Sequence, residues 1–103
     1  MVHPDAFDRS ALRSAMSAAV VRLVARAAAE RWPIRADHCF LRIAYDNAAG
    51  AKWDTVHARP GWATLPPDQL AAAVAVLTRI EGEGRAALDP LNAASLAFRR
   101  AAR

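Results

Sequence analysis

The sequence has a single cysteine, no long uncharged run and no useful stretch of alternating apolar and polar residues. One cysteine, Cys39, cannot form an internal disulfide, which excludes a disulfide-stabilised scaffold and is compatible with a reducing compartment. The longest uncharged stretch is the ten residues 69–78, far short of a membrane span. Without strand alternation, helices are left as the basis of the fold.

The first residues, Met-Val-His-Pro-Asp, have neither the basic region nor the apolar region of a signal peptide. The arginines, serines and alanines that follow are typical of a transit peptide, but Asp5 and Asp8 argue against one. We therefore expect a cytoplasmic protein that does not associate with a membrane.

Lysine is nearly absent although the chain is basic. Thirteen of the fourteen basic residues are arginine, and the net charge is +4. High-GC bacterial coding produces such a bias without selection for function. A basic balance permits contact with nucleic acid or another acidic surface. Because the arginines are scattered, we expect mainly a solvated helical surface, with arginine-driven nucleic-acid binding as an alternative.

The length of 103 residues predicts a single helical domain over 1–103 with a modest core. Apolar residues recur three and four positions apart in four segments, which predicts four helices in a compact bundle. The first two helices are expected over 8–31 and over 38–49, the second with Asp37 as its N-cap and Gly50 at its end. The third is expected from Pro67 to about Ile80, with Gly82 and Gly84 ending it. The fourth is expected to begin with Asp89 as its N-cap and Pro90 at the first helical position.

The segment 52–65 contains Trp53 and Trp62 and the turn-forming residues 59–61. We expect it to be irregular, with one helical turn around 53–57. Because tryptophans favour burial, we also expect this aromatic loop to fold back over the core.

A polar stripe of His38, Arg42 and Asp46 lies opposite the apolar face of the second expected helix. An arginine between a histidine and a carboxylate can bind a phosphate or a carboxylate. The alternative is an exposed helix face on which Arg42 pairs with Asp46. Asn47 lies within the apolar arc, and we expect its amide to bond backbone groups of the 52–65 loop because an unpaired buried amide is costly.

The loop residues Trp53, Arg59 and Trp62 combine aromatic rings with charge. Tryptophan and arginine are enriched among the residues that dominate protein interfaces. Arg59 with Trp62 can also stack on a nucleic-acid base. The alternative is that the tryptophans simply close a small, alanine-rich core.

The sequence contains the ingredients of two further sites without the spacing that either needs. Cys39, His57 and an acid such as Asp46 or Asp54 are the residue types of a thiol nucleophile, but no local signature accompanies them. Adjacent helical residues such as His38 and Cys39 point about 100° apart, which disfavours a shared metal. We therefore predict neither a catalytic residue nor a metal site, and no cofactor.

The run Arg79-Ile80-Glu81-Gly82-Glu83-Gly84 resembles the Arg-x-x-Gly-x-Gly pyrophosphate loop of the GCN5-related N-acetyltransferases. The resemblance implies a CoA-dependent acyltransferase in which Arg79, Gly82 and Gly84 contact the cofactor, through backbone amides at a helix N-terminus. It also implies a β-strand before the loop, where this chain is alanine-rich and helix-periodic.

Together these observations favour a small non-enzymatic helical module that binds a protein partner or forms a homo-oligomer. The predicted binding residues are His38, Arg42, Asp46, Trp53, Arg59 and Trp62. A CoA-dependent acyltransferase and an arginine-driven nucleic-acid-binding protein are the alternatives.

Overall fold

The structure is a computed structural model that describes the chain from Pro4 onward, with side chains from Arg9. Residues 1–3 and the side chains of Asp5 and Asp8, on which the expectations about targeting rest, lie outside it. The elements are α1 (Pro4–Glu30), α2 (Asp37–Ala49), a 3₁₀ turn η1 (Trp53–Thr55), α3 (Gly61–Thr64), α4 (Pro67–Glu83) and α5 (Arg85–Ala101). The described residues 4–103 contain no strand, which confirms the predicted all-α class. The four predicted helices correspond to α1, α2, α4 and α5.

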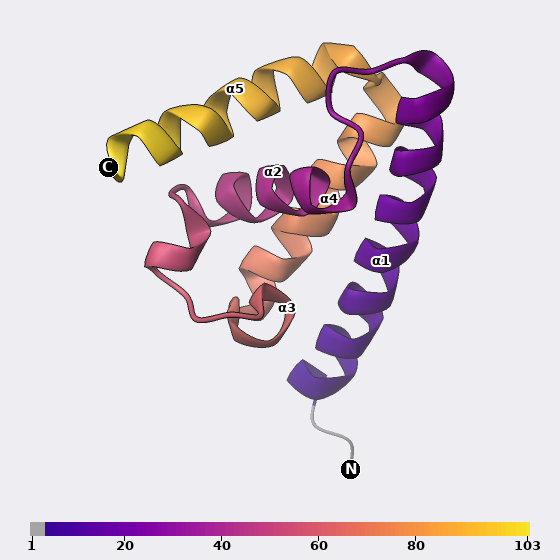
Figure 1. The fold of residues 1–103 in the computed structure, drawn as a ribbon. Helices are drawn as coiled ribbons and strands as arrows, with labels where there is room; N and C mark the ends of the chain where they lie inside the picture. Colours follow the sequence, from indigo (N-terminus) through magenta and orange to yellow (C-terminus); the bar gives the residue numbers. More distant parts are fainter. Residues whose placement is uncertain (1–3) are drawn as a thin grey trace.

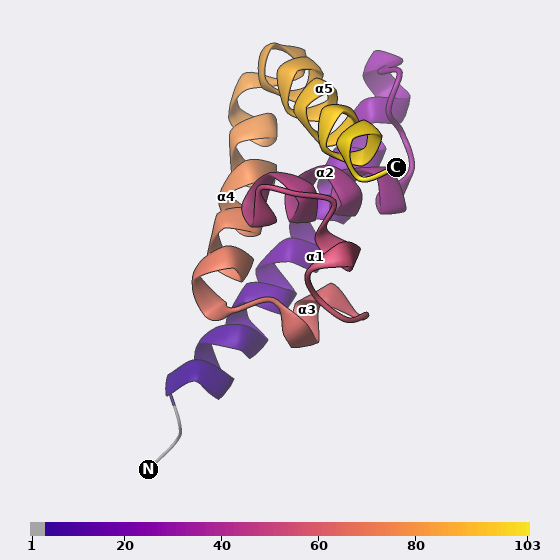
Figure 2. The same cartoon turned by 90° about the vertical axis from the view of Figure 1, so that its left-hand side faces the viewer.

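Helix α4 is the centre of the core, because it packs against both α1 and α2 over most of its length (Figures 1 and 2). Its apolar side chains recur three and four residues apart and therefore lie on one face of the helix. The four fully buried ones are Leu70, Ala73, Leu77 and Ile80. The partner helices contribute their predicted faces, and the buried residues there are Met16, Ala19, Val20, Leu23 and Ala27 of α1 and Phe40, Ile43 and Ala44 of α2.

Helix α1 ends at Glu30, close to the predicted stop before Pro33. Arg31 adopts the left-handed conformation with φ 57°, and the Trp32 amide donates back to the Ala27 carbonyl at 2.9 Å. This turn returns the Trp32 indole to the core, where it is 2 % exposed and meets the Phe40 ring edge-on at 6.5 Å.

The predicted start of the last helix at Asp89 and Pro90 is wrong, because α5 begins at Arg85. Helix α4 runs through Gly82, and Gly84 alone separates the two helices, with a φ of 63°. The Gly84 carbonyl accepts from the amides of Ala87 and Leu88, and both of these residues are fully buried. Burial of this first turn therefore outweighs the start signal at Pro90.

Pro90 consequently lies inside α5, where it cannot donate to the carbonyl four residues before it. That carbonyl belongs to Ala86, which is exposed, so water can satisfy it. Asp89 pairs with Arg85 at 3.0 Å instead of capping the helix.

The N-cap of α2 also differs from the prediction. Ala36 occupies the cap position and makes no side-chain bond, while Asp37 is the first helical residue. The Asp37 carboxylate accepts from the neighbouring His38 amide at 2.6 Å, and its charge suits the helix N-terminus. At the other end Gly50, with φ 67°, terminates the helix as predicted.

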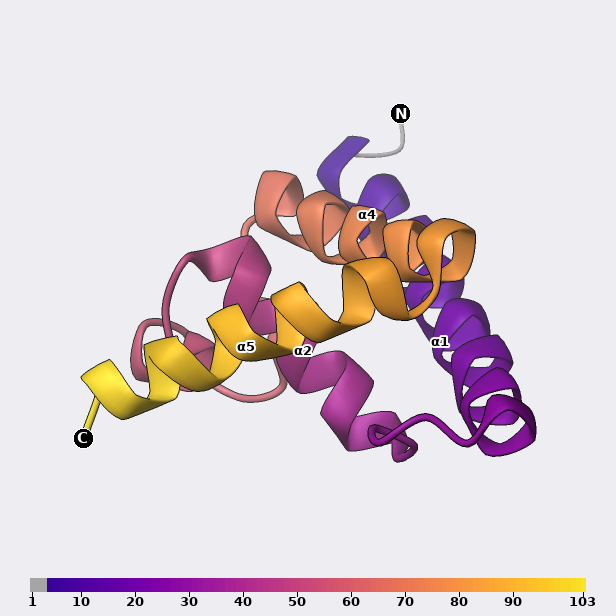
Figure 3. The same cartoon turned by 90° about the horizontal axis from the view of Figure 1, so that it is seen from above.

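Helix α5 crosses over α2, as Figure 3 shows from above. The segment 52–65 leaves the end of α2, forms η1 and α3, and returns to α4. Trp53 is buried and Trp62 is partly buried against the core. Arg9 of α1 donates to the carbonyls of Trp62 and Leu65, so this segment is fixed to α1 as well.

The central position of α4 gives the first test. We expect Leu77→Ala, at a fully buried position, to lower the free energy of unfolding by about 2–5 kcal/mol, since it removes apolar contacts and leaves a cavity. Leu96→Ala in α5 is the matched control, because Leu96 is 41 % exposed and should cost clearly less. Urea unfolding followed by circular dichroism measures both, and equal losses would contradict the packing.

Candidate functional site

A buried carboxylate lies where α2, α5 and the 52–65 segment meet. Asp46 of α2 is 0 % exposed. Its Oδ2 atom accepts from the Ser95 hydroxyl at 2.6 Å and from Arg99 Nε at 2.8 Å. Its Oδ1 atom accepts from the Trp53 amide at 3.0 Å and from Arg99 Nη2 at 3.2 Å. The negative charge is thus removed from water but met by hydrogen-bond donors and by an opposite charge.

The prediction that Arg42 pairs with Asp46 on an exposed helix face is therefore wrong. Helix α5 covers this face of α2 and supplies Arg99 as the partner of Asp46. Arg42 reaches across to α5 instead, where Nη1 donates to Ser95 Oγ and Nη2 donates to Asn92 Oδ1, each at 2.8 Å. A polar stripe that repeats every four residues can face another helix or face solvent. The residue types of the stripe did not indicate that α5 covers it.

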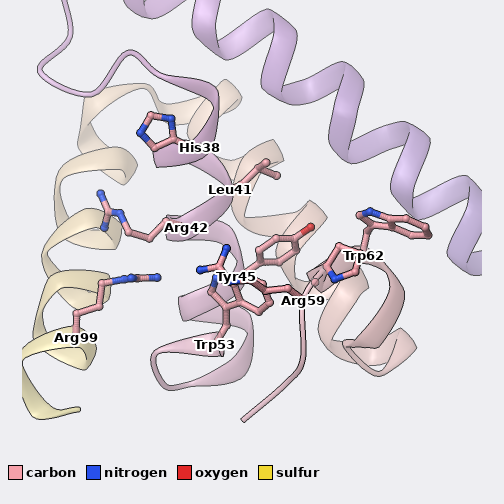
Figure 4. Close-up of a pocket in the computed structure, with 10 residues that line it drawn as sticks. His38, Leu41, Arg42, Tyr45, Trp53, Arg59, Trp62 and Arg99 are labelled. Carbon is pink, nitrogen blue, oxygen red and sulfur yellow. The ribbon is translucent and has the colours of Figure 1, made fainter. Parts of the chain in front are cut away.

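A groove of about 440 Å³ opens beside this network, between α2, α5 and the 52–65 segment (Figure 4). The lining consists of ten residues: His38, Leu41, Arg42, Tyr45, Trp53, Arg59, Pro60, Gly61, Trp62 and Arg99. Figure 4 shows the Arg42 side chain reaching from α2 toward α5 and the Arg99 side chain reaching from α5 toward α2. The groove therefore combines guanidinium groups on one side with aromatic rings on the other.

The aromatic side of the groove is packed around Tyr45. Its ring lies 5.0 Å from the Trp53 ring, tilted by 55°. Gly61 approaches the Tyr45 ring so closely that a Cβ atom there would lie 2.9 Å from it, which explains the glycine at this point of the chain. Burial raises the pKa of the Tyr45 hydroxyl, while the Trp62 backbone and the charge of Arg13 act in the opposite direction. Tyr45 is therefore neutral at physiological pH.

Trp62 closes the end of the groove nearest α1. The guanidinium of Arg13 stacks over the Trp62 ring at 3.5 Å from its centroid, a cation–π arrangement. One face of this indole is thus already occupied.

The three guanidinium groups of the lining differ in how their charge is balanced. Arg99 pairs with buried Asp46, and Arg59 donates to Asp54 at 2.7 Å while lying 5.2 Å from the centre of the Trp53 ring. The hydrogen bond from Arg59 lowers the pKa of the Asp54 carboxyl, against the opposing effect of its burial. Among the described residues, Arg42 bonds only to the neutral groups of Ser95 and Asn92.

The structure places five of the six predicted binding residues on the lining of this one groove: His38, Arg42, Trp53, Arg59 and Trp62. Asp46 lies behind the lining, where it orients Arg99. The His38 side chain is 81 % exposed at the rim.

Leu41, Tyr45 and Arg99 also line the groove, and the sequence analysis did not select them. One signal for Arg99 was present, because Asn92, Ser95 and Arg99 form a polar stripe spaced three and four residues apart on α5.

Asn47 makes backbone hydrogen bonds, but not to the predicted partners. Its Nδ2 donates to the Ile43 carbonyl at 2.8 Å and to the Leu91 carbonyl at 3.0 Å, so it links α2 to α5. The contact to the 52–65 segment is made by the neighbouring Asp46 through the Trp53 amide. The prediction chose the wrong one of two adjacent polar residues.

His57 and the two acids considered with Cys39 as a thiol nucleophile all bond to other side chains. His57 Nε2 lies 2.7 Å from Gln69 Oε1, and the two acids, Asp46 and Asp54, pair with arginines. Within the described part of the chain, no group of three His, Cys, Asp or Glu side chains is arranged to hold a metal ion. None of the helices described there combines the length and apolar character needed to cross a lipid bilayer.

The segment that resembles the acetyltransferase loop is helical up to Glu83. Arg79 pairs with Glu83 one turn away at 2.9 Å, Gly82 is exposed within α4, and the Gly84 amide donates to the Ile80 carbonyl at 2.7 Å. The acyltransferase interpretation stays a prediction from the sequence.

No family model, curated protein or solved structure matches this chain. The site must therefore be interpreted from its own chemistry.

The burial of Asp46 gives the second test. Asp46→Asn keeps the shape but removes the charge that balances Arg99, and we expect it to lower the free energy of unfolding by roughly 3 kcal/mol or more. Asp89→Asn is the control, since it breaks the exposed Arg85–Asp89 pair and should cost under about 0.5 kcal/mol.

Urea unfolding of the two variants, monitored by tryptophan fluorescence, makes this comparison. If Asp46→Asn loses its cooperative unfolding transition and Asp89→Asn keeps it, this also indicates a large loss of stability in Asp46→Asn. Equal midpoints for the two variants would show that the buried ion pair does not fix the contact between α2 and α5.

Proposed function

We propose that this chain is a small, non-enzymatic helical binding module whose groove receives an acidic segment of a partner protein. One observation carries the proposal: three arginines and three aromatic residues line the same groove, and the described lining includes no acidic side chain. Arginine and aromatic residues are those that dominate protein interfaces. A lining of this charge attracts an anionic partner and disfavours a cationic one.

The lining supports binding better than catalysis. Its described residues include no serine, cysteine, lysine or carboxylate that could act as a nucleophile or as a general base. Tyr45 is held neutral, and His38 lies at the exposed rim, where its neighbour Asp37, 3.5 Å away, is also exposed. The groups that line the groove are therefore sufficient for binding a partner.

A protein is favoured over a nucleic acid by the state of the other arginines. Several of them outside the groove are already neutralised by ion pairs: Arg22 with Glu81, Arg26 with Glu30, Arg79 with Glu83 and Arg85 with Asp89. Paired arginines of this kind do not form the continuous basic track that a phosphate backbone needs. The rings are also poorly placed for base stacking, because Trp53 is buried and one face of Trp62 is covered by Arg13.

Affinity capture with matched variants tests the proposal. Wild-type chain, Arg42→Met, Arg59→Met and Arg79→Met are immobilised, and bound proteins are quantified from a lysate of the native host. We expect the two groove variants to recover partner proteins at least about tenfold less well, as the loss of a charged interface hydrogen bond implies. Arg79→Met removes the same side chain from an ion pair outside the groove lining and should bind like the wild type.

Equal recovery by all four proteins would overturn the proposal. Recovery of nucleic acid instead of protein, lost steeply with added salt and in the groove variants alone, would replace it by the arginine-driven alternative. Circular dichroism of each variant confirms that the fold is kept.

A further inference from the structure

The hydrogen-bonded network behind the groove has fewer anions than cations. Asp46 pairs with Arg99 and accepts from Ser95, while Arg42 donates to Ser95 and Asn92 and has no carboxylate partner among the described residues. Arg59 pairs with Asp54 at 2.7 Å, and Lys52 lies 3.9 Å from the same carboxylate. The guanidinium side of the groove therefore carries an excess of positive charge.

Arg42 and Arg99 both have N–H groups that no described residue accepts. Each guanidinium has five N–H groups in a fixed plane. Arg42 uses its two terminal nitrogens once each, and Arg99 uses Nε and one terminal nitrogen. Three N–H groups on each side chain are thus available to a ligand, in the forked geometry that matches a carboxylate.

These donors are held in place before a ligand arrives. Arg42 is fixed by Ser95 and Asn92, and the Arg99 side chain is only 25 % exposed because it lies against Asp46. A side chain already held in its binding conformation loses little entropy on binding. The groove therefore favours a ligand whose anionic group is small and planar.

The part of the lining formed by Leu41, Tyr45 and Trp62 is suited to contact with an apolar side chain. Leu41 and Tyr45 lie one turn apart on α2, with the partly buried Trp62 beside them (Figure 4). An apolar side chain placed on this surface would remove more of it from water. Leu41 directly precedes Arg42 in the chain, so the apolar and the cationic parts of the lining adjoin.

From this arrangement we infer that the groove recognises a peptide segment in which acidic and large apolar side chains alternate. Arg42 and Arg99 bind an aspartate or glutamate carboxylate of this segment. An adjacent leucine or phenylalanine packs on the apolar surface formed by Leu41, Tyr45 and Trp62. The inference rests on the proposed function and specifies the chemistry of the partner segment. A carboxylate is planar, and its two oxygens match the forked N–H groups of the two guanidinium groups.

The test uses unlabelled peptides and resonances of the groove itself. The probe is acetyl-Gly-Glu-Phe-Glu-Leu-Glu-Gly-amide, whose blocked ends leave side-chain carboxylates as its only charges. One comparison peptide replaces each glutamate by glutamine, and a second replaces phenylalanine and leucine by serine. Titration into ¹⁵N-labelled protein follows the Arg42 Nε and Trp62 indole signals.

We expect the glutamate–phenylalanine peptide to shift both signals, and each comparison peptide to bind at least tenfold more weakly. Arg42→Gln should weaken the probe at least tenfold, while Arg85→Gln, which breaks an exposed ion pair on the same helix as Arg99, should leave it unchanged. Arg42→Lys should bind at an intermediate strength, because it keeps the charge but loses the forked geometry.

A glutamine peptide that binds as well as the probe would overturn the inference. So would tighter binding, at the same resonances, of a phosphoserine peptide or of a twelve-residue thymidine oligonucleotide. If capture of partner proteins depends on Arg42 but the probe does not bind, the carboxylate inference fails alone. If capture does not depend on Arg42, the proposed function fails as well.

Discussion

The arrangement of α2, α5 and the 52–65 segment depends on one buried carboxylate, that of Asp46. A carboxylate taken out of water costs several kcal/mol unless donors and an opposite charge surround it. Asp46 finds them on two other parts of the chain, at Ser95 and Arg99 of α5 and at the Trp53 amide. Because such a pair adds little net stability, we infer that its main effect is to favour the register in which Ser95 and Arg99 of α5 face Asp46.

The groove is a consequence of this constraint. The bond from Trp53 to Asp46 holds the start of the 52–65 segment beside α2, and Gly61 lets the rest of it approach the Tyr45 ring. The same network holds Arg42 where it reaches toward α5 and Arg99 where it reaches toward α2, on one side of the groove (Figure 4). The carboxylate that joins α2, α5 and the 52–65 segment thus also orients Arg99 on the lining of the groove.

The sequence predicted the parts of the fold that local rules control. The apolar faces of α1, α2 and α4 and the stop at Gly50 follow from helical spacing and from the left-handed preference of glycine. The start of α5 did not follow, because burial of Ala87 and Leu88 outweighed the signal at Pro90. The residues that the sequence analysis selected for binding in the middle segment, Trp53, Arg59 and Trp62, lie on the lining of one groove. The partner of Asp46 was missed because Arg99 lies 53 residues away along the chain, and only the crossing of α5 over α2 brings the two together.

Hydrogen exchange at the Trp53 amide tests this account most directly. Trp53 is the first residue of η1, so its amide has no partner within that turn and donates to Asp46 Oδ1 instead. If the buried carboxylate holds the segment in place, this amide should exchange only through global unfolding, with the same opening free energy as the Leu77 amide in the core of α4. Exchange of the Trp53 amide through local opening, far faster than at Leu77, would contradict the central role of Asp46.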